Sequence, residues 1–153
     1  MAGSGKSREV GEVWYKSLAA TTSLDDAGYT LSIDGSGNLT KGAAGEAPYA
    51  VNYKSTESPH SSGSYQPGVN TGVFAEGWAD LKLVSTNSQI IVGDAVGLDG
   101  NASGGQIDKV SIGTVDTSTF ALEYKKVVGI AEAAKDASAG GTVLTRLRIG
   151  GVR

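Results

Sequence analysis

Apolar and polar residues alternate over short stretches of this chain, with the period of two that is typical of half-buried β-strands. The clearest case is residues 142–149, where every second side chain from Val143 to Ile149 would lie on one face and Arg146 and Arg148 on the other. Shorter apolar stretches that we also expect to be extended cover residues 29–33, 49–53, 73–84, 88–98, 107–115, 119–124 and 125–131.

Turn-forming residues separate these stretches at 34–38, 99–105 and 136–141, where Asp, Asn, Ser and Gly gather. Glycine provides 23 of the 153 residues, a content that long helices tolerate poorly. The best helix candidate, residues 131–137, is barely two turns long and needs tertiary support. The regular spacing of strands and turns therefore predicts an all-β protein with little helix, a small barrel or sandwich.

Two segments fall outside this regular pattern. Residues 55–72 form a long polar stretch, which in a compact domain signals either function or disorder. Residues 1–12 are small and polar, and we expect them to be a disordered arm. Trp14 and Tyr15 follow this arm directly and, if extended, cannot both face one core. We therefore divide the chain into an N-terminal arm, 1–15, and one β-rich domain, 16–153, with a long loop at 55–72.

Composition narrows the chemistry that the chain can perform. The length suits one domain with a core of its own. There is no cysteine, which excludes disulfides, thiol catalysis and cysteine-ligated metals, and His60 is the single histidine. The net charge of −3 does not suit a nucleic-acid-binding protein. No apolar run is long enough to span a bilayer and no secretory signal is present, so we expect synthesis in the cytosol.

Two short motifs resemble ligand-binding loops and are better explained as local structure. Gly3–Ser7 matches the end of a phosphate-binding loop, but the first glycine and the preceding strand of that motif are missing. Residues 99–104 match the first half of a calcium loop, but Val110 stands where a bidentate Glu is required. We predict a flexible arm and a hairpin turn respectively, with no metal and no cofactor.

Candidate catalytic groups are equally sparse. His60 lies in a serine-rich loop that does not preorganise a nucleophile and its base, and the chain has no Gly-x-Ser-x-Gly motif. Asp25 and Asp26 are adjacent, so they would point apart on a strand and be solvated in a turn. We therefore predict that the protein has no catalytic site and is not an enzyme.

Three motifs in the distal half resemble the small capsid decoration proteins of tailed viruses, also called capsid cement proteins. They are Gln89-Ile-Ile-Val-Gly-Asp-Ala-Val96, Val127-Val-Gly-Ile-Ala131, and Ala139-Gly-Gly-Thr-Val143 running into Leu147-Arg-Ile-Gly150. The similarity covers roughly residues 84–151, a little under half of the chain. The residues between 19 and 72 have no counterpart in the shorter members of that family.

The resemblance implies a compact β-barrel or β-tulip domain that forms a homotrimer on the outer surface of an icosahedral head. There it would clamp neighbouring subunits of the major capsid protein, with an N-terminal arm on the capsid surface. The protein would then be a structural component of the virion of a bacteriophage or an archaeal tailed virus, with no direct contact to nucleic acid or membrane.

An extended arm can add a strand to the exposed sheet edge of a partner, and the segment that runs into the first aromatics is suited to this role. The residues that we expect to bind the capsid are Arg8, Glu9, Val10, Val13, Trp14 and Tyr15. We expect Phe74 and Trp78 to be candidates for the contact between subunits.

Two other functions are compatible with the sequence. A virion or cell-surface module could recognise glycans or a host surface through loop 55–72, with His60 and Tyr65 exposed on it. A hydrolase using His60 or a carboxylate pair is the third alternative, and the arguments above disfavour it.

Overall fold

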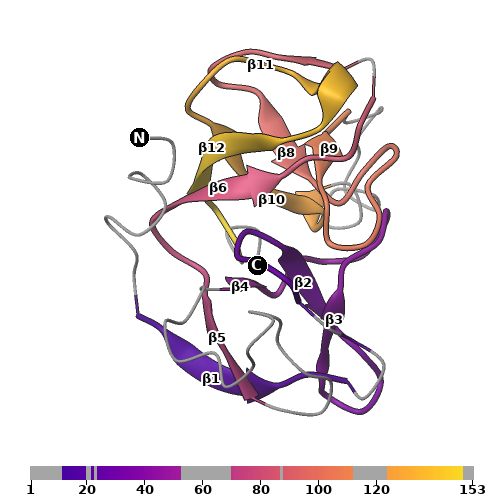
Figure 1. The fold of residues 1–153 in the computed structure, drawn as a ribbon, viewed down its shortest axis with the longest axis vertical. Coiled ribbons are helices and arrows are strands. Elements are labelled where there is room, and N and C mark those ends of the chain that lie inside the picture. The colour runs from indigo at the N-terminus through magenta and orange to yellow at the C-terminus, as the bar shows by residue number, and fades with distance from the viewer. Residues whose placement is uncertain are drawn as a thin grey trace.

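The computed structural model of the protein describes residues 12–19, 22, 24–52, 70–86, 88–111 and 124–149. These residues form an all-β protein, as the sequence pattern predicted, with antiparallel sheets and one short 3-10 turn, η2 (Ala137–Ala139). Two five-stranded sheets follow one another along the chain and lie at opposite ends of the long axis (Figure 1). No helix within the described ranges is long and apolar enough to cross a membrane.

The N-terminal sheet closes on itself. Its strands have the spatial order β1-β5-β4-β2-β3, and a parallel bridge between Leu18 and Leu39 joins its two outer strands. The amide of Ala19 donates to the carbonyl of Leu39 at 2.9 Å across this closure. We call this unit the N-terminal barrel; its strands are β1 (Trp14–Ser17), β2 (Thr30–Ile33), β3 (Leu39–Lys41), β4 (Ala50–Asn52) and β5 (Asn70–Phe74).

The second sheet closes in the same way. Its order is β6-β12-β10-β8-β9, and a parallel bridge between Leu83 and Ile107 joins the outer strands. Here the amide of Val84 donates to the carbonyl of Ile107 at 3.0 Å. This C-terminal barrel consists of β6 (Trp78–Lys82), β8 (Ala95–Gly97), β9 (Asp108–Lys109), β10 (Val127–Ala131) and β12 (Thr142–Leu147), beside a separate pair, β7 (Gln89–Ile90) and β11 (Lys135–Asp136).

The two barrels are a structural repeat. With the strands of each barrel taken in chain order, both spatial orders read first, fifth, fourth, second, third. The registers also agree over most of the paired residues, apart from a register shift between β10 and β8 at Val127 and Gly129. Corresponding pairs are Lys16–Thr71 and Leu81–Val143, Leu31–Lys41 and Val96–Lys109, Thr30–Val51 and Ala95–Ile130, and Val51–Phe74 and Ile130–Arg146.

Each barrel has its own hydrophobic core. Leucines dominate the N-terminal core, which includes Leu24, Leu31 and Leu39, all fully buried. The larger C-terminal core is built around Leu81, Ile107 and their neighbours, and it also takes up Val51 and Phe74 from the N-terminal barrel. Burial of these side chains, at about 1.5–3 kcal/mol each, is the main force holding the strands in place. Because the second core draws on both barrels, it also holds the barrels together.

Backbone hydrogen bonds join the barrels along a seam. The amide of Thr30 donates to Gly105 at 2.8 Å, Gly45 donates to Leu98 at 2.8 Å, and Lys82 donates to Gly28 at 2.9 Å. Gly28 has a φ of +90°, and a Cβ there would lie 2.4 Å from the carbonyl oxygen of Asp80. Only glycine therefore allows the backbones to approach this closely.

The structure corrects several element predictions. Residues 131–137 are not helical, because they complete β10, form β11 and enter η2. The segment 88–98 is two strands, β7 and β8, separated by a turn at Gly93, whose φ is +98°. The polar segment 55–72 ends earlier than predicted, since β5 begins at Asn70. Beyond Ser111, the extended segments expected before Tyr124 lie outside the described residues.

Candidate functional site

The aromatic pair that was assigned to the arm belongs to the N-terminal barrel. Trp14 and Tyr15 lie in β1, which pairs antiparallel with β5, Trp14 opposite Val73 and Tyr15 opposite Gly72. The predicted boundary at residue 15 is therefore wrong, because the folded domain already includes β1. The other predicted arm residues, Arg8, Glu9 and Val10, lie outside the described part of the chain.

β1 uses its two faces differently. Trp14 is half-buried against the N-terminal core, and its ring meets that of Tyr49 edge-on at 6.2 Å. On the same side, the Lys16 ammonium lies 5.7 Å from the centre of the Tyr49 ring, a cation–π contact. The Tyr15 side chain is 62% exposed on the opposite face, close to Gly72. The two neighbouring aromatics thus do face different surroundings.

Val13 also packs inside the molecule. Its side chain is half-buried against the C-terminal core, so it spans the two barrels just before β1 begins. Of the predicted capsid-binding residues that the structure describes, Tyr15 alone is exposed, while Val13 and Trp14 serve the protein's own cores.

The predicted subunit contact through Phe74 is wrong. The Phe74 side chain is 2% exposed, because β5 places it in the C-terminal core of its own chain. Trp78 is half-buried at the start of β6, and its indole Nε1 donates to Oε1 of Glu132 at 3.3 Å. The same carboxylate oxygen lies 3.1 Å from Nε of Arg146. Trp78 is therefore anchored within its own barrel.

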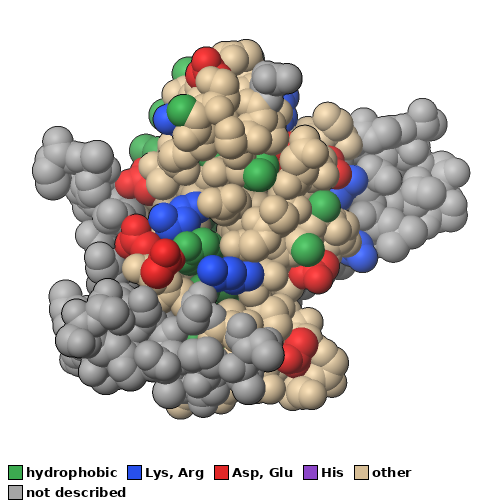
Figure 2. Space-filling view, turned by 45° about the vertical axis from the view of Figure 1, so that its right-hand side comes forward, with side chains coloured by type: hydrophobic (Ala, Val, Ile, Leu, Met, Phe, Trp, Pro, Cys, Tyr) green, Lys and Arg blue, Asp and Glu red, His purple; other side chains and the backbone are tan. Residues whose placement is uncertain are grey.

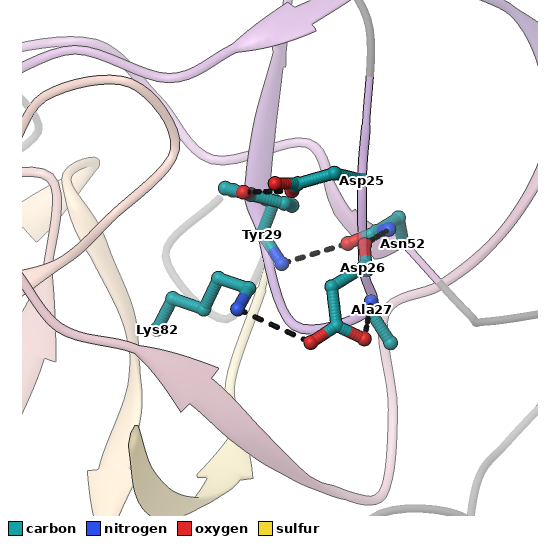
Figure 3. Close-up of polar contacts among 6 residues, drawn as sticks. All are labelled: Asp25, Asp26, Ala27, Tyr29, Asn52 and Lys82. Atoms are coloured by element: carbon teal, nitrogen blue, oxygen red, sulfur yellow. Dashed lines mark hydrogen bonds and ion pairs between the residues drawn. The ribbon is translucent and has the colours of Figure 1, made fainter. Parts of the chain in front are cut away.

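A polar cluster lies at the seam where the turn before β2 meets β6 (Figure 3). The Tyr29 amide donates to Oδ1 of Asn52 at 2.7 Å, and the Tyr29 hydroxyl donates to Asp25. Lys82 forms an ion pair with Asp26 at 3.3 Å. Asp25 therefore points to Tyr29 in its own barrel and Asp26 to Lys82 across the seam, so the two do not form a catalytic carboxylate pair.

The electrostatics of this cluster favour a neutral tyrosine. Burial raises the pKa of Tyr29, and its hydrogen bond to Asp25 raises it further. The same bond lowers the pKa of the Asp25 carboxyl. The ammonium groups of Lys41 and Lys82 lie 4.4 and 5.2 Å from the centre of the Tyr29 ring. The cluster thus holds Tyr29 protonated and fixes the seam, and it gives Tyr29 no tendency to act as a base or nucleophile.

Positive and negative side chains are interspersed on the face shown in Figure 2, around a small hydrophobic patch. This surface carries no extended basic field among its coloured residues, unlike a nucleic-acid interface. Within the described ranges no three acidic or histidine side chains come together as a metal site.

The calcium-loop resemblance at residues 99–104 is explained by a turn, as predicted. Asp99 accepts a hydrogen bond from the amide of Ser111 at 2.9 Å and pairs with Lys126 at 3.1 Å. Burial would raise the pKa of Asp99, but these partners lower it overall. Its carboxylate oxygens are therefore occupied by protein groups.

One surface feature was missed by sequence reasoning, a turn that exposes two large apolar side chains. Ile91 and Val92 are each 61% exposed, between β7 and β8. The carboxylate of Asp94 fixes the turn: the Ile91 amide donates to its Oδ2 at 3.0 Å, and Lys109 pairs with the same oxygen at 3.0 Å. The sequence contains the signal, Gly93-Asp94 after an apolar run, but the pattern over residues 88–98 predicted one extended segment.

The predicted loop residues His60 and Tyr65 lie outside the described residues. No protein-family model matches the chain, and no curated protein matches it either.

Proposed function

We propose that this protein is a capsid decoration protein, a non-catalytic component that binds the outer surface of a viral head and stabilises the lattice of the major capsid protein. The observation that carries the proposal is the placement of the three motifs that resemble capsid cement proteins. They lie far apart in sequence, yet the strands β8, β10 and β12 that they enter are direct neighbours in one barrel, and β7 of the first motif pairs with β11 beside it. The motifs therefore form a single structural unit.

The capsid contact is assigned to the residues just before β1. Arg8, Glu9 and Val10 lead into a strand at the outer edge of the order β1-β5-β4-β2-β3. Such a segment can add a strand to a capsid subunit, where main-chain hydrogen bonds provide affinity. In a homotrimer three segments act together, which raises the affinity through effective concentration. Binding to the assembled lattice alone then shifts the assembly equilibrium toward the intact shell.

The test uses the major capsid protein encoded in the same genome, assembled into shells and mixed with this chain. The full chain is expected to co-sediment with expanded shells and to appear as added density by electron microscopy. Deletion of residues 1–11, which leaves β1 intact, should abolish co-sedimentation while the unfolding transition stays cooperative. The matched control deletes residues 2–7 and keeps Arg8, Glu9 and Val10, and it should still bind.

Two outcomes would count against the proposal at different levels. If the full chain does not bind shells, the decoration function is wrong. If the 1–11 deletion binds with unchanged affinity, the chain decorates shells through another surface and the assignment to residues 8–10 is wrong.

A further inference from the structure

The repeat extends to the turn before the second strand of each barrel. In the N-terminal barrel Gly28 donates to the Asn52 carbonyl and Asn52 donates to that of Tyr29, at 3.4 and 3.2 Å. In the C-terminal barrel the same two bonds are Gly93 to Ala131 and Ala131 to Asp94, both at 2.8 Å. Both glycines have a positive φ, +90° and +98°. The turn Asp26-Ala27-Gly28 therefore corresponds to the turn Ile91-Val92-Gly93.

Within the chain, the first of these turns covers the free edge of β6. The Lys82 amide donates to Gly28, and the Gly28 backbone lies against the Asp80 carbonyl. A polar pair completes the contact, because Asp26 on the turn binds the Lys82 ammonium on the strand. The contact joins the turn of one barrel to the first strand of the next barrel, a head-to-tail arrangement.

The described residues leave both of the surfaces that would repeat this contact uncovered. The turn Ile91-Val92-Gly93 exposes its two apolar side chains, and a Cβ at Gly93 would meet nothing within 4 Å. The counterpart of β6 is β1, where Tyr15 corresponds to Asp80 and Ser17 to Lys82. β1 pairs with β5 alone among the described strands, apart from the closing bridge at Leu18.

The side chains on these two surfaces also match each other. The internal contact uses an acid and a base, Asp26 and Lys82. Their counterparts on the uncovered surfaces are Ile91 and Ser17, and the apolar side chains beside these are Val92 on the turn and the exposed Tyr15 ring on the strand. Contiguous exposed apolar side chains are a feature of interaction sites. The first turn thus presents an acid to the lysine of β6. The second turn presents apolar side chains that suit the exposed tyrosine of β1.

We propose that a second copy of this chain binds here, with Ile91, Val92 and Gly93 of one copy docked on β1 of the next. In this contact Ser17 donates its amide to the Gly93 carbonyl, as Lys82 does to Gly28 within the chain, and Tyr15 covers the two apolar side chains. Because the two surfaces differ, the interface is heterologous and generates a ring if it closes. A ring of three copies is the homotrimer of the proposed function, on which this number rests.

The test is the oligomeric state of the free protein, measured by light scattering and sedimentation over a concentration series. The wild-type chain is expected to self-associate. The turn variant Ile91→Asp/Val92→Asp and the strand variant Tyr15→Asp should each raise the dissociation constant at least about tenfold, because each buries charge at the interface. Ile33→Asp changes another exposed apolar side chain, outside both surfaces, and should leave self-association unchanged.

A mixture of the two variants gives the sharpest outcome. Each variant alone should be monomeric, but the intact turn of the strand variant can dock on the intact β1 of the turn variant. Mixing is therefore expected to produce a one-to-one dimer that does not grow. A mixture that stays monomeric, or a wild-type chain that is monomeric up to about 1 mM, would overturn the interface.

These results are independent of the capsid experiment. A monomeric chain that still decorates shells overturns the interface and leaves the decoration function standing. A chain that forms the head-to-tail oligomer but does not bind shells overturns the decoration function and leaves the interface standing. Cooperative thermal unfolding of each variant confirms that the comparison is between folded proteins.

Discussion

The two barrels share a backbone and differ in what their corresponding positions contain. Lys41 and Lys109 are counterparts on the third strand, yet Lys41 lies over the ring of Tyr29 and Lys109 pairs with the carboxylate of Asp94. Tyr29 and Asp94 are themselves counterparts after the repeated turn. The lysine at this position therefore contacts the residue at the same partner position in both barrels. The contact is a cation–π interaction in the N-terminal barrel and an ion pair in the C-terminal barrel. Strand register is therefore maintained although the chemistry at the paired positions has changed.

The first strands show the larger difference. Leu81 of β6 is fully buried, whereas its counterpart Lys16 of β1 is only half-buried. Leu81 lies in the C-terminal core, and the edge of β6 is covered by the Gly28 turn, while β1 pairs with β5 alone among the described strands apart from the bridge at Leu18. One position in a repeated fold can therefore serve as core or surface according to its neighbours. The predictions below change one barrel and use its counterpart in the other as the control.

The largest effect is expected at the repeated glycine. Gly28→Ala should destabilise the protein by about 3 kcal/mol or more, because a positive φ is combined with a Cβ 2.4 Å from the Asp80 carbonyl oxygen. Gly93→Ala introduces the same backbone strain, but its Cβ would meet no atom within 4 Å. It should therefore lower the free energy of unfolding by only about 1–2 kcal/mol. Urea unfolding of both variants measures the free energy of unfolding.

The difference between the two glycine variants isolates the seam. Equal destabilisation would mean that the close approach of Gly28 to β6 contributes nothing beyond backbone strain. That result would also weaken the internal contact as the template for a contact between copies.

A smaller effect is expected at a buried pair of counterparts on the fifth strands. Thr71 is buried in β5, and its Oγ1 has no hydrogen-bond partner in the described structure, whereas its counterpart in β12 is the buried Val143. Thr71→Val should stabilise the protein by about 1 kcal/mol, since it removes an unsatisfied hydroxyl at nearly constant shape. The reverse change, Val143→Thr, should destabilise it by about 1–2 kcal/mol.

Thermal and urea unfolding of the two variants measure the change in the free energy of unfolding, which should be positive for Thr71→Val and negative for Val143→Thr. A Thr71→Val variant that is less stable than the wild type would show that the hydroxyl has a partner, such as a buried water, and that the two barrels differ at this position.

The smallest effect concerns pH. The folded-state pKa of Asp25 is lowered from its ordinary 3.8, so its contribution is present above that value and is lost as pH falls through the folded pKa. Tyr29→Phe removes the hydrogen bond that is the main cause and should raise the Asp25 pKa toward 3.8. Because Asp25 is exposed, the stability change should be no more than a few tenths of a kcal/mol.

Carboxyl NMR titration measures the pKa of Asp25 directly in the wild type and in the Tyr29→Phe variant. Asp94 in the other barrel serves as the control, because a hydrogen bond from the Ile91 amide is the main cause that lowers its pKa. Its pKa should not change in the Tyr29→Phe variant. An unchanged Asp25 pKa would show that the tyrosine hydroxyl does not control this carboxyl.

Local patterns predicted the strands that alternate clearly, such as 30–33 and 142–147, and the turn at 34–38, where Asp34 accepts from the amides of Ser36 and Asn38. They failed where a local signal had two interpretations. Residues 131–137 are rich in alanine, but Ala131, Lys135 and Asp136 pair in strands, and this pairing overrides a weak helix propensity. Phe74 and Trp14 are both aromatic, and nothing local shows that the first is fully enclosed and the second half-buried.

The repeat itself left only a faint trace in the sequence. Ile33-Asp34-Gly35 and Leu98-Asp99-Gly100 are corresponding segments, and each ends its strand in an Asp-Gly turn. Between them the counterparts differ in size and charge, as Tyr29 and Asp94 do, so no period stands out by eye. The candidate docking turn at Ile91 and Val92 was hidden for the same reason, because exposed and buried apolar residues look alike in one dimension.

Strand period, turn chemistry and the near absence of helix are set by neighbours a few residues apart, so they could be derived from the residue order. Which strands pair, how each sheet closes at Leu18–Leu39 and Leu83–Ile107, and which edges stay open depend on partners distant in the chain. Those pairings are decided by the total burial that a complete barrel achieves, which no single segment encodes. Exposure of the Ile91 turn and of the β1 edge is a property of the assembled fold, and it appeared only there.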